Sequence, residues 1–255
     1  MSLSYNFTLL MMIFLRMSGC VLFNPILGRR NIPNVVKIGL TLLLSLFAYR
    51  VTPASAAPEI HSLIVLFVCG VKELLVGFLV GFVIQLFLSV IVMGGELSDM
   101  QVGISMARVY DPQSAVSMPL SASLVNAMFY LLFFSTNAHL TLIQIFVRLC
   151  AVVPYGDAPV PAGVFGGLSA LFAQMLIYAV KLSLPMVAVQ LIGEIGAGLV
   201  MRAVPQIDIF VVQIQLQFLI GFLVMLFLVP PYASFLERLI ALMFDRISDL
   251  FGALV

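Results

Sequence analysis

Few residues of this 255-residue sequence have the types and spacing needed for catalysis. Ser105 could be paired with His139, but the Gly-x-Ser-x-Gly frame of a serine hydrolase fails because its last position is Ala107. Asp111 follows Tyr110 as in intramembrane aspartyl proteases, yet the Gly-x-Gly-Asp motif that carries their second aspartate is missing. We therefore expect no catalytic site and no enzyme activity.

Metal-binding and cofactor-binding patterns are equally sparse. His61, the only other histidine, has no neighbouring ligand, and the sequence contains no His-Glu-x-x-His motif. The cysteines Cys20, Cys69 and Cys150 lie in separate apolar runs and form no Cys-x-x-Cys pair, so we expect them to be buried small hydrophobic side chains. The sequence predicts no metal and no cofactor.

Residues 94–112 gather glycines, carboxylates, methionines and a terminal Asp-Pro between two long apolar runs. Non-helical backbone at membrane depth survives only where protein buries it or where it lines a water-filled path. Met100 and Met106 would supply deformable apolar surface, and Asp111-Pro112 would end a helix. Two interpretations stay open: an ordinary loop, or a flexible plug that seals a pore and moves when cargo enters.

Charged residues within or beside apolar runs form a second group of candidates: Lys72, Glu73, Lys181, Glu194 and Arg202. An ionisable group inside a membrane is a functional candidate by default, because leaving it unpaired is costly. A proton pathway would repeat carboxylates along one helix face, and the sequence lacks that pattern. Structural pairing between helices or between subunits is therefore favoured.

Small residues form two surfaces on the expected helices: Gly70, Gly77 and Gly81 on one, and Gly193, Gly196, Ala197 and Gly198 on the other. Small side chains let a second helix approach closely. The partner helix could belong to the same chain or to another subunit, and the spacing does not separate these two possibilities.

The elements that position these residues are strongly apolar helices. The sequence is 63% hydrophobic and 9% charged, with a mean hydropathy of +1.20, which is typical of an integral membrane protein. The net charge of +1 offers no basic patch for nucleic acid. The apolar runs cover residues 7–27, 35–49, 63–93, 120–153, 164–204 and 209–229, and an amphipathic tail covers residues 230–255.

These runs do not match the length of about 20 residues that one membrane span requires. The run 63–93 is too long, 35–49 is short, and 120–153 is broken near 135–139, which predicts two short helices folded as a hairpin. The run 164–204 contains Pro185 and is also expected to form two helices. Such lengths suit an all-α protein whose helices pack mainly against protein.

The basic residues give conflicting signals on orientation. Arg29, Arg30 and Lys37 would place the first loop in the cytoplasm, and Arg238 and Arg246 would place the tail there too. Six simple spans cannot satisfy both, so at least one segment is expected to be re-entrant or paired.

Three motifs in order resemble the FliR family of flagellar biosynthetic proteins. Arg16 followed by residues 25–28 and 37–40 resembles the family's opening, and residues 100–103 through 109–112 resemble its central loop. Residues 202–210 resemble its Arg-x-x-Pro-Gln-x-Asn-x-Phe signature. Asp208 stands where the family usually has asparagine and could pair with Arg202, and residues 213–217 lack the expected glycine and proline.

The resemblance implies a single-copy subunit of the type III export gate in the bacterial inner membrane, within the flagellar basal body. It implies one membrane domain over 1–255, a FliP-like part joined to a FliQ-like part, with long and short helices forming hairpins in a hetero-oligomeric ring. FliP-like, FliQ-like, FlhB-like and FlhA-like proteins, unfolded protein cargo and membrane lipid would be its partners. The central loop, within an insert over 94–118, would be the plug.

The resemblance assigns the plug to these residues, with Met118 nearby: Ile104, Met106, Ala107, Arg108, Val109, Tyr110, Asp111 and Pro112. The residue patterns themselves predict subunit packing at Gly70, Gly77, Gly81, Gly193 and Ala197, and buried charge at Lys72, Glu73, Lys181, Glu194, Arg202 and Asp208. An equivalent subunit of a virulence-type injectisome is the alternative. A small-solute secondary transporter is less favoured, because the sequence shows no internal repeat.

Overall fold

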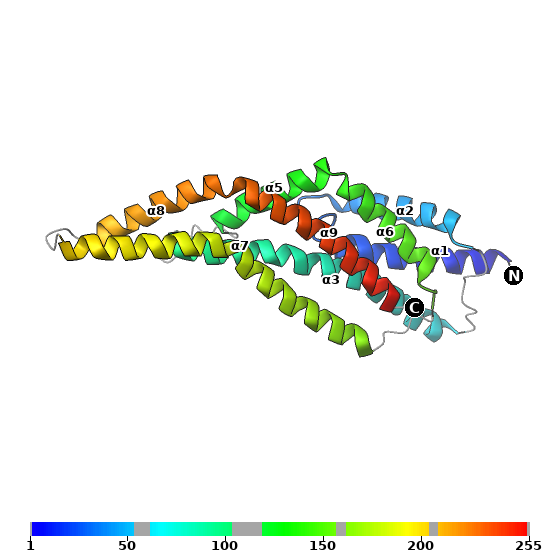
Figure 1. Ribbon diagram of the computed structural model, residues 1–255. Coiled ribbons are helices and arrows are strands. Elements are labelled where there is room, and N and C mark those ends of the chain that lie inside the picture. The colour runs from blue at the N-terminus through cyan, green and yellow to red at the C-terminus, as the bar shows by residue number, and fades with distance from the viewer. Residues whose placement is uncertain (1, 54–61, 104–118, 157–161, 204–208, 254–255) are drawn as a thin grey trace. The chain divides into compact units, whose positions relative to one another are not determined.

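The computed structural model describes residues 2–53, 62–103, 119–156, 162–203 and 209–253. These residues form α1 (Ser2–Leu22), α2 (Asn34–Val51), α3 (Leu63–Val102), α5 (Leu120–Ser135), α6 (Ala138–Val152), α7 (Ala162–Ala203), α8 (Ile209–Phe227) and α9 (Val229–Ala253) (Figure 1). No strand occurs in these ranges. The predicted all-α class is confirmed.

Several helices are long and apolar enough to cross a membrane. Residues 34–51, 63–102 and 164–200 each qualify, and the number rises to as many as five if each of two bent helix pairs counts as one span. α3 has 40 residues and α7 has 42, so each is about 60 Å long, twice the hydrocarbon thickness of about 30 Å. The prediction of an integral membrane protein with over-long helices is confirmed.

Two boundaries differ from the sequence prediction. Residues 164–203 of the predicted run lie in one continuous helix, α7, which contains Pro185 and is not divided into two helices. A proline removes one backbone hydrogen bond without ending a helix whose other contacts are strong. α3 also continues beyond the predicted run 63–93 to Val102, so the predicted insert over 94–118 begins within this helix. Gly94 and Gly95 allow neighbouring helices to pack closely here: a side chain at Gly94 would meet Leu182 on α7, and one at Gly95 would meet Ala122 on α5.

The break predicted within 120–153 is present. α5 ends at Ser135, and α6 begins at Ala138 after Asn137, whose φ of 56° lies in the left-handed region that asparagine tolerates. Residues 230–253 of the predicted tail belong to α9, and the buried side chains of this helix recur at helical spacing: Leu236, Leu239, Ile240, Met243 and Ile247.

The chain divides into two compact units. Unit 1 comprises residues 1–87, 137–171 and 241–255, and unit 2 comprises residues 88–136 and 172–240. Neither is a continuous stretch of sequence, because α3, α7 and α9 each contribute residues to both.

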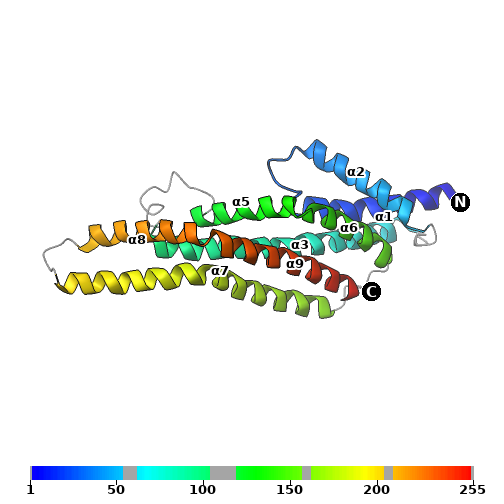
Figure 2. The ribbon, with the colours of Figure 1, turned by 45° about the horizontal axis from the view of Figure 1, so that its top comes forward.

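In unit 1, α1 packs against α2, and both contact α6. The first half of α3 packs on α1, and the core contains Met12, Ile13, Met17 and Phe146. In unit 2, α5 packs on the last turns of α3, while α8 lies beside the second half of α7 (Figure 2). The core of unit 2 includes Phe129, Phe133, Leu182 and Met186.

Candidate functional site

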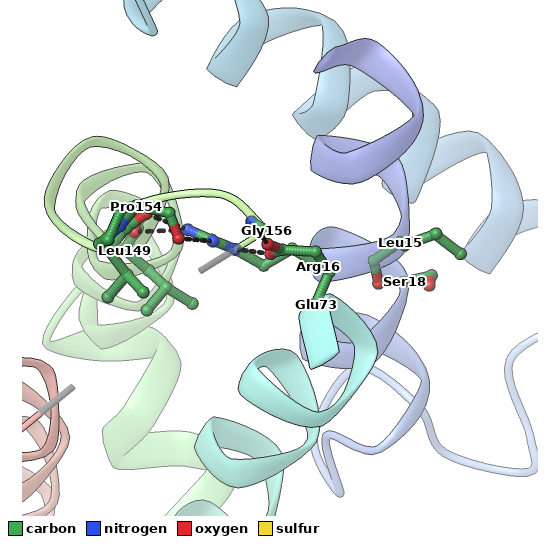
Figure 3. A network of polar contacts seen from close by, with 8 residues as sticks. Leu15, Arg16, Ser18, Glu73, Leu149, Pro154 and Gly156 are labelled. Atoms are coloured by element: carbon green, nitrogen blue, oxygen red, sulfur yellow. Dashed lines mark hydrogen bonds and ion pairs between the residues drawn. The ribbon is translucent and has the colours of Figure 1, made fainter. Parts of the chain in front are cut away.

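A buried ion pair connects three parts of unit 1. Arg16 on α1 and Glu73 on α3 are both 0% exposed, and Arg16 Nε donates a hydrogen bond of 2.6 Å to Glu73 Oε2. Figure 3 shows the guanidinium between Glu73 and backbone oxygens at the end of α6. A buried charge is tolerated only when its partners are in place.

The other guanidinium nitrogens bind the end of α6. Arg16 Nη1 donates to the carbonyl oxygens of Leu149 at 3.1 Å and Val153 at 2.8 Å, and Nη2 donates to that of Pro154 at 3.1 Å. The last carbonyls of a helix lack partners within the helix and carry partial negative charge. Arg16 therefore caps α6 as well as neutralising Glu73.

The segment after α6 completes the network. Gly156 N donates to Glu73 Oε1 at 2.9 Å, and Gly156 has a φ of 80°, which favours glycine. The Tyr155 ring centroid lies 4.0 Å from Arg16 Cζ, in cation–π geometry. Burial raises the pKa of the Tyr155 phenol, so the ring stays neutral. With both Glu73 oxygens bonded, the network is suited to joining helices.

Glu73 was among the buried charges predicted from the sequence, but its partner Arg16 was not. The only sequence signal for this partner was a single arginine within an apolar run.

The other predicted charges lie in more open surroundings. Lys72 is half-buried, and Lys181 is exposed with its Nζ 5.3 Å from the Tyr178 ring centroid. Glu194 Oε1 accepts a 2.9 Å hydrogen bond from Gln217 Nε2. Arg202 is exposed, and Asp208 lies outside the described residues.

The first glycine surface is occupied within the chain. A side chain at Gly77 would meet the Arg16 carbonyl oxygen, one at Gly81 would meet the backbone of Phe23, and one at Gly70 would meet Leu15. Gly19, which the sequence analysis did not select, completes the crossing of α1 and α3: its added Cβ would lie 2.9 Å from Gly77 Cα. These glycines therefore take part in close approach of backbones within unit 1.

The second glycine surface is more open. An added Cβ at Gly193 would lie 3.0 Å from Ile220 Cδ1, whereas Gly196 and Gly198 have nothing within 4 Å. Ala197 is half-exposed. A role in subunit packing stays a prediction for both surfaces.

The predicted plug residues 104–112 and Met118 lie outside the described residues, but both flanks of that segment are described. Asp99, near the end of α3, accepts hydrogen bonds from Leu120 N at 2.6 Å, Ser121 N at 3.0 Å and Ser121 Oγ at 2.5 Å. A carboxylate on the first amides of a helix is a stabilising cap. Asp99 thereby joins the end of α3 to the start of α5, a function that sequence analysis did not identify.

Polar side chains also link α7 and α8 in unit 2. Gln190 Nε2 donates to the Gln217 carbonyl oxygen at 2.9 Å, and Gln217 in turn binds Glu194. Gly221 lies opposite Val102 and Gln190, with no room for a side chain. The end of α3 therefore packs against the same part of α8 that carries these hydrogen bonds.

Comparison with known proteins gives consistent matches over nearly the whole chain. The family model described as bacterial export proteins, family 1, matches residues 7–243. The chain is 30% identical to the flagellar biosynthetic protein FliR of Escherichia coli K12, covering 94% of this chain and 91% of that protein. It is 28% identical to FliR of Bacillus subtilis, covering 86% and 85% of the two chains. It is also 24% identical to the Yop proteins translocation protein T of Yersinia pestis, covering 94% and 92%.

Proposed function

Because this chain belongs to the bacterial export proteins of family 1, we propose that it is a subunit of the flagellar type III protein export gate. It helps to form and seal the channel through which unfolded flagellar proteins leave the cytoplasm. The observation that carries this proposal is the family match over residues 7–243, together with FliR relatives that align over most of both chains. The role is structural, with no chemical step assigned to the chain.

We further propose that the chain lies in the inner membrane and assembles with FliP-like and FliQ-like subunits, near FlhB-like and FlhA-like components. The exposed apolar surface of α7 and α8 supports assembly with other helices or with lipid. It includes Ile192 at 69% exposure, Ile195 at 67% and Phe227 at 80%. Exposed large apolar side chains on neighbouring helices are typical of a protein or membrane interface.

The equivalent gate role in an injectisome is the second candidate, supported by the relative from Yersinia pestis. The higher identity to the FliR relatives favours the flagellar role. An in-frame deletion in the host, complemented with the intact gene, tests this choice. Loss of swimming and of secreted flagellin, both restored by complementation, supports the flagellar gate. Normal swimming together with loss of another secreted protein set would assign the chain to an injectisome.

We propose that residues 106–112 form part of the plug, and deleting residues 106–111 tests this proposal. The deletion removes the methionine and its apolar neighbours that would seal the channel, so we expect the assembled gate to leak ions. Nine residues remain between Gly103 and Pro119 and can span up to about 30 Å, so the bonds of Asp99 to α5 can persist. The measurement is ion flux across vesicles that contain the purified complex.

A second variant separates chain length from side-chain chemistry. Six glycine and serine residues in place of 106–111 keep the length and remove the apolar side chains, and we expect the same leak. Both variants should form the complex in normal yield. If vesicles that contain either variant leak ions no faster than vesicles with the same amount of the intact complex, the plug assignment is wrong.

A further inference from the structure

An apolar groove of about 320 Å³ runs between α1 and α2 in unit 1. It is lined by Phe7, Leu10, Met11 and Phe14 on α1, and by Leu42, Ser45 and Leu46 on α2. The only side-chain hydroxyl among these residues, that of Ser45, donates its hydrogen to the Thr41 carbonyl oxygen at 2.6 Å. The groove therefore presents a hydrocarbon-like wall.

A basic turn lies at the start of α2. Arg29 and Arg30 are exposed there, and the turn is closed by a 3.0 Å hydrogen bond from Ile32 N to the Arg29 carbonyl oxygen. Lys37 Nζ holds the same turn by donating to the Gly28 carbonyl oxygen at 3.0 Å. The turn is thus anchored to the first part of α2.

The first 58 residues contain five basic residues and no aspartate or glutamate. Of the five, Arg16 is buried against Glu73, whereas Arg29, Arg30 and Arg50 are exposed. Arg50 lies in the last turn of α2, at the opposite end from the basic turn. The start of α2 therefore carries a cluster of positive charge at Arg29, Arg30 and Lys37, and its other end supplies a matched control position.

The distance from the basic turn to the groove fits one leaflet of a bilayer. Leu42 and Leu46 follow Asn34 by 8 and 12 residues, which corresponds to about 12 and 18 Å along α2. Half of a hydrocarbon core about 30 Å thick is about 15 Å. α2 itself qualifies as a membrane span.

We propose that this groove and the basic turn bind one anionic phospholipid. Its phosphate lies at Arg29 and Arg30, and one acyl chain lies in the groove between α1 and α2. A partner helix would account for the apolar groove but not for the exposed arginines at the start of α2. Basic residues at the membrane surface favour anionic over zwitterionic headgroups.

The test uses the full-length protein in the complex purified from its host in mild detergent. Lipid retention is measured by native mass spectrometry after exchange into phosphatidylglycerol or phosphatidylcholine. We expect one tightly held phosphatidylglycerol per copy of this chain and no comparable phosphatidylcholine. Replacing both arginines, Arg29→Gln with Arg30→Gln, should weaken phosphatidylglycerol binding about thirty-fold, from roughly 1 kcal/mol for each arginine. Arg50→Gln should leave it unchanged.

Leu46→Trp, which places a bulky side chain over the groove, should also reduce retention of phosphatidylglycerol without changing complex yield. Equal retention of the two lipids by the intact protein would overturn the proposal. So would equal losses in Arg50→Gln and in the double variant. If Leu46→Trp instead releases a partner subunit and leaves lipid retention unchanged, the groove is a protein interface and the proposal fails. None of these outcomes depends on whether the chain serves a flagellum or an injectisome.

Discussion

Replacing Arg16 with methionine is expected to lower the free energy of unfolding of this protein by about 3–5 kcal/mol, because it leaves the Glu73 carboxylate buried without a counter-ion. Both side chains are 0% exposed, so water cannot replace the lost bonds unless unit 1 opens. The end of α6 also loses the guanidinium that binds the carbonyl oxygens of Leu149, Val153 and Pro154. The measurement is thermal unfolding of the purified complex, with the amount of protein in the membrane as a second readout.

Two further variants separate the ion pair from general packing. In the double variant Arg16→Met with Glu73→Leu no buried charge remains, so it should recover part of the loss. Arg16→Lys keeps the charge but cannot reproduce the geometry of a guanidinium that binds one carboxylate and three carbonyls, so it should fall between Arg16→Met and the intact protein. If Arg16→Met unfolds at the same temperature as the intact protein, the network does not stabilise unit 1.

The helical content of this protein follows directly from its composition and apolar runs. The break that separates α5 from α6 was predicted, because the polar stretch over 135–139 interrupts an apolar run. The continuity of α7 past Pro185 was not predicted, since a proline marks a possible boundary but does not determine one. Local sequence thus specified where helices form more accurately than where the long ones end.

The polar contacts could not be predicted, because each depends on residues far apart in sequence. Glu73 pairs with Arg16, 57 residues away, and Asp99 caps a helix that begins 21 residues later. Neither spacing carries a local signal. For Glu73, a charged residue in an apolar run indicated that a partner had to exist, but only the packing of the helices identified Arg16. Asp99 lies in the polar insert over 94–118 and was not among the predicted buried charges.

For the glycines, the sequence predicted the type of contact but not the partner helix. Their spacing predicted close helix approach, which the structure shows for Gly70 and Gly77 against α1, while Gly81 approaches Phe23 just after that helix. Glycine spacing does not specify which helix approaches, because any small-residue face accommodates any backbone of suitable curvature. The tightest crossing needed a second glycine, Gly19, on the other helix.

Gly77→Ala is expected to destabilise the protein by about 1–3 kcal/mol, the usual cost of forcing extra volume into a packed core. The added Cβ would meet the Arg16 carbonyl oxygen and would lie 2.7 Å from Cys20 N and 2.8 Å from Gly19 Cα. All three are backbone atoms, so relief requires α1 to move away from α3. That movement would also displace Arg16 from Glu73, so Gly77→Leu should be worse still.

Gly39→Ala and Gly166→Ala are the matched controls for Gly77→Ala. Both glycines lie in helices, and an added Cβ at either would have no neighbour within 4 Å. Alanine is favoured over glycine inside a helix by about 0.5–1 kcal/mol, so both controls should unfold at the same or a higher temperature than the intact protein. Thermal unfolding of the three variants, together with the yield of assembled complex, therefore distinguishes a glycine needed for helix packing within the chain from one needed for contacts between subunits. If Gly77→Ala keeps its unfolding temperature but loses its partner subunits, Gly77 packs between subunits and its contact with α1 is secondary.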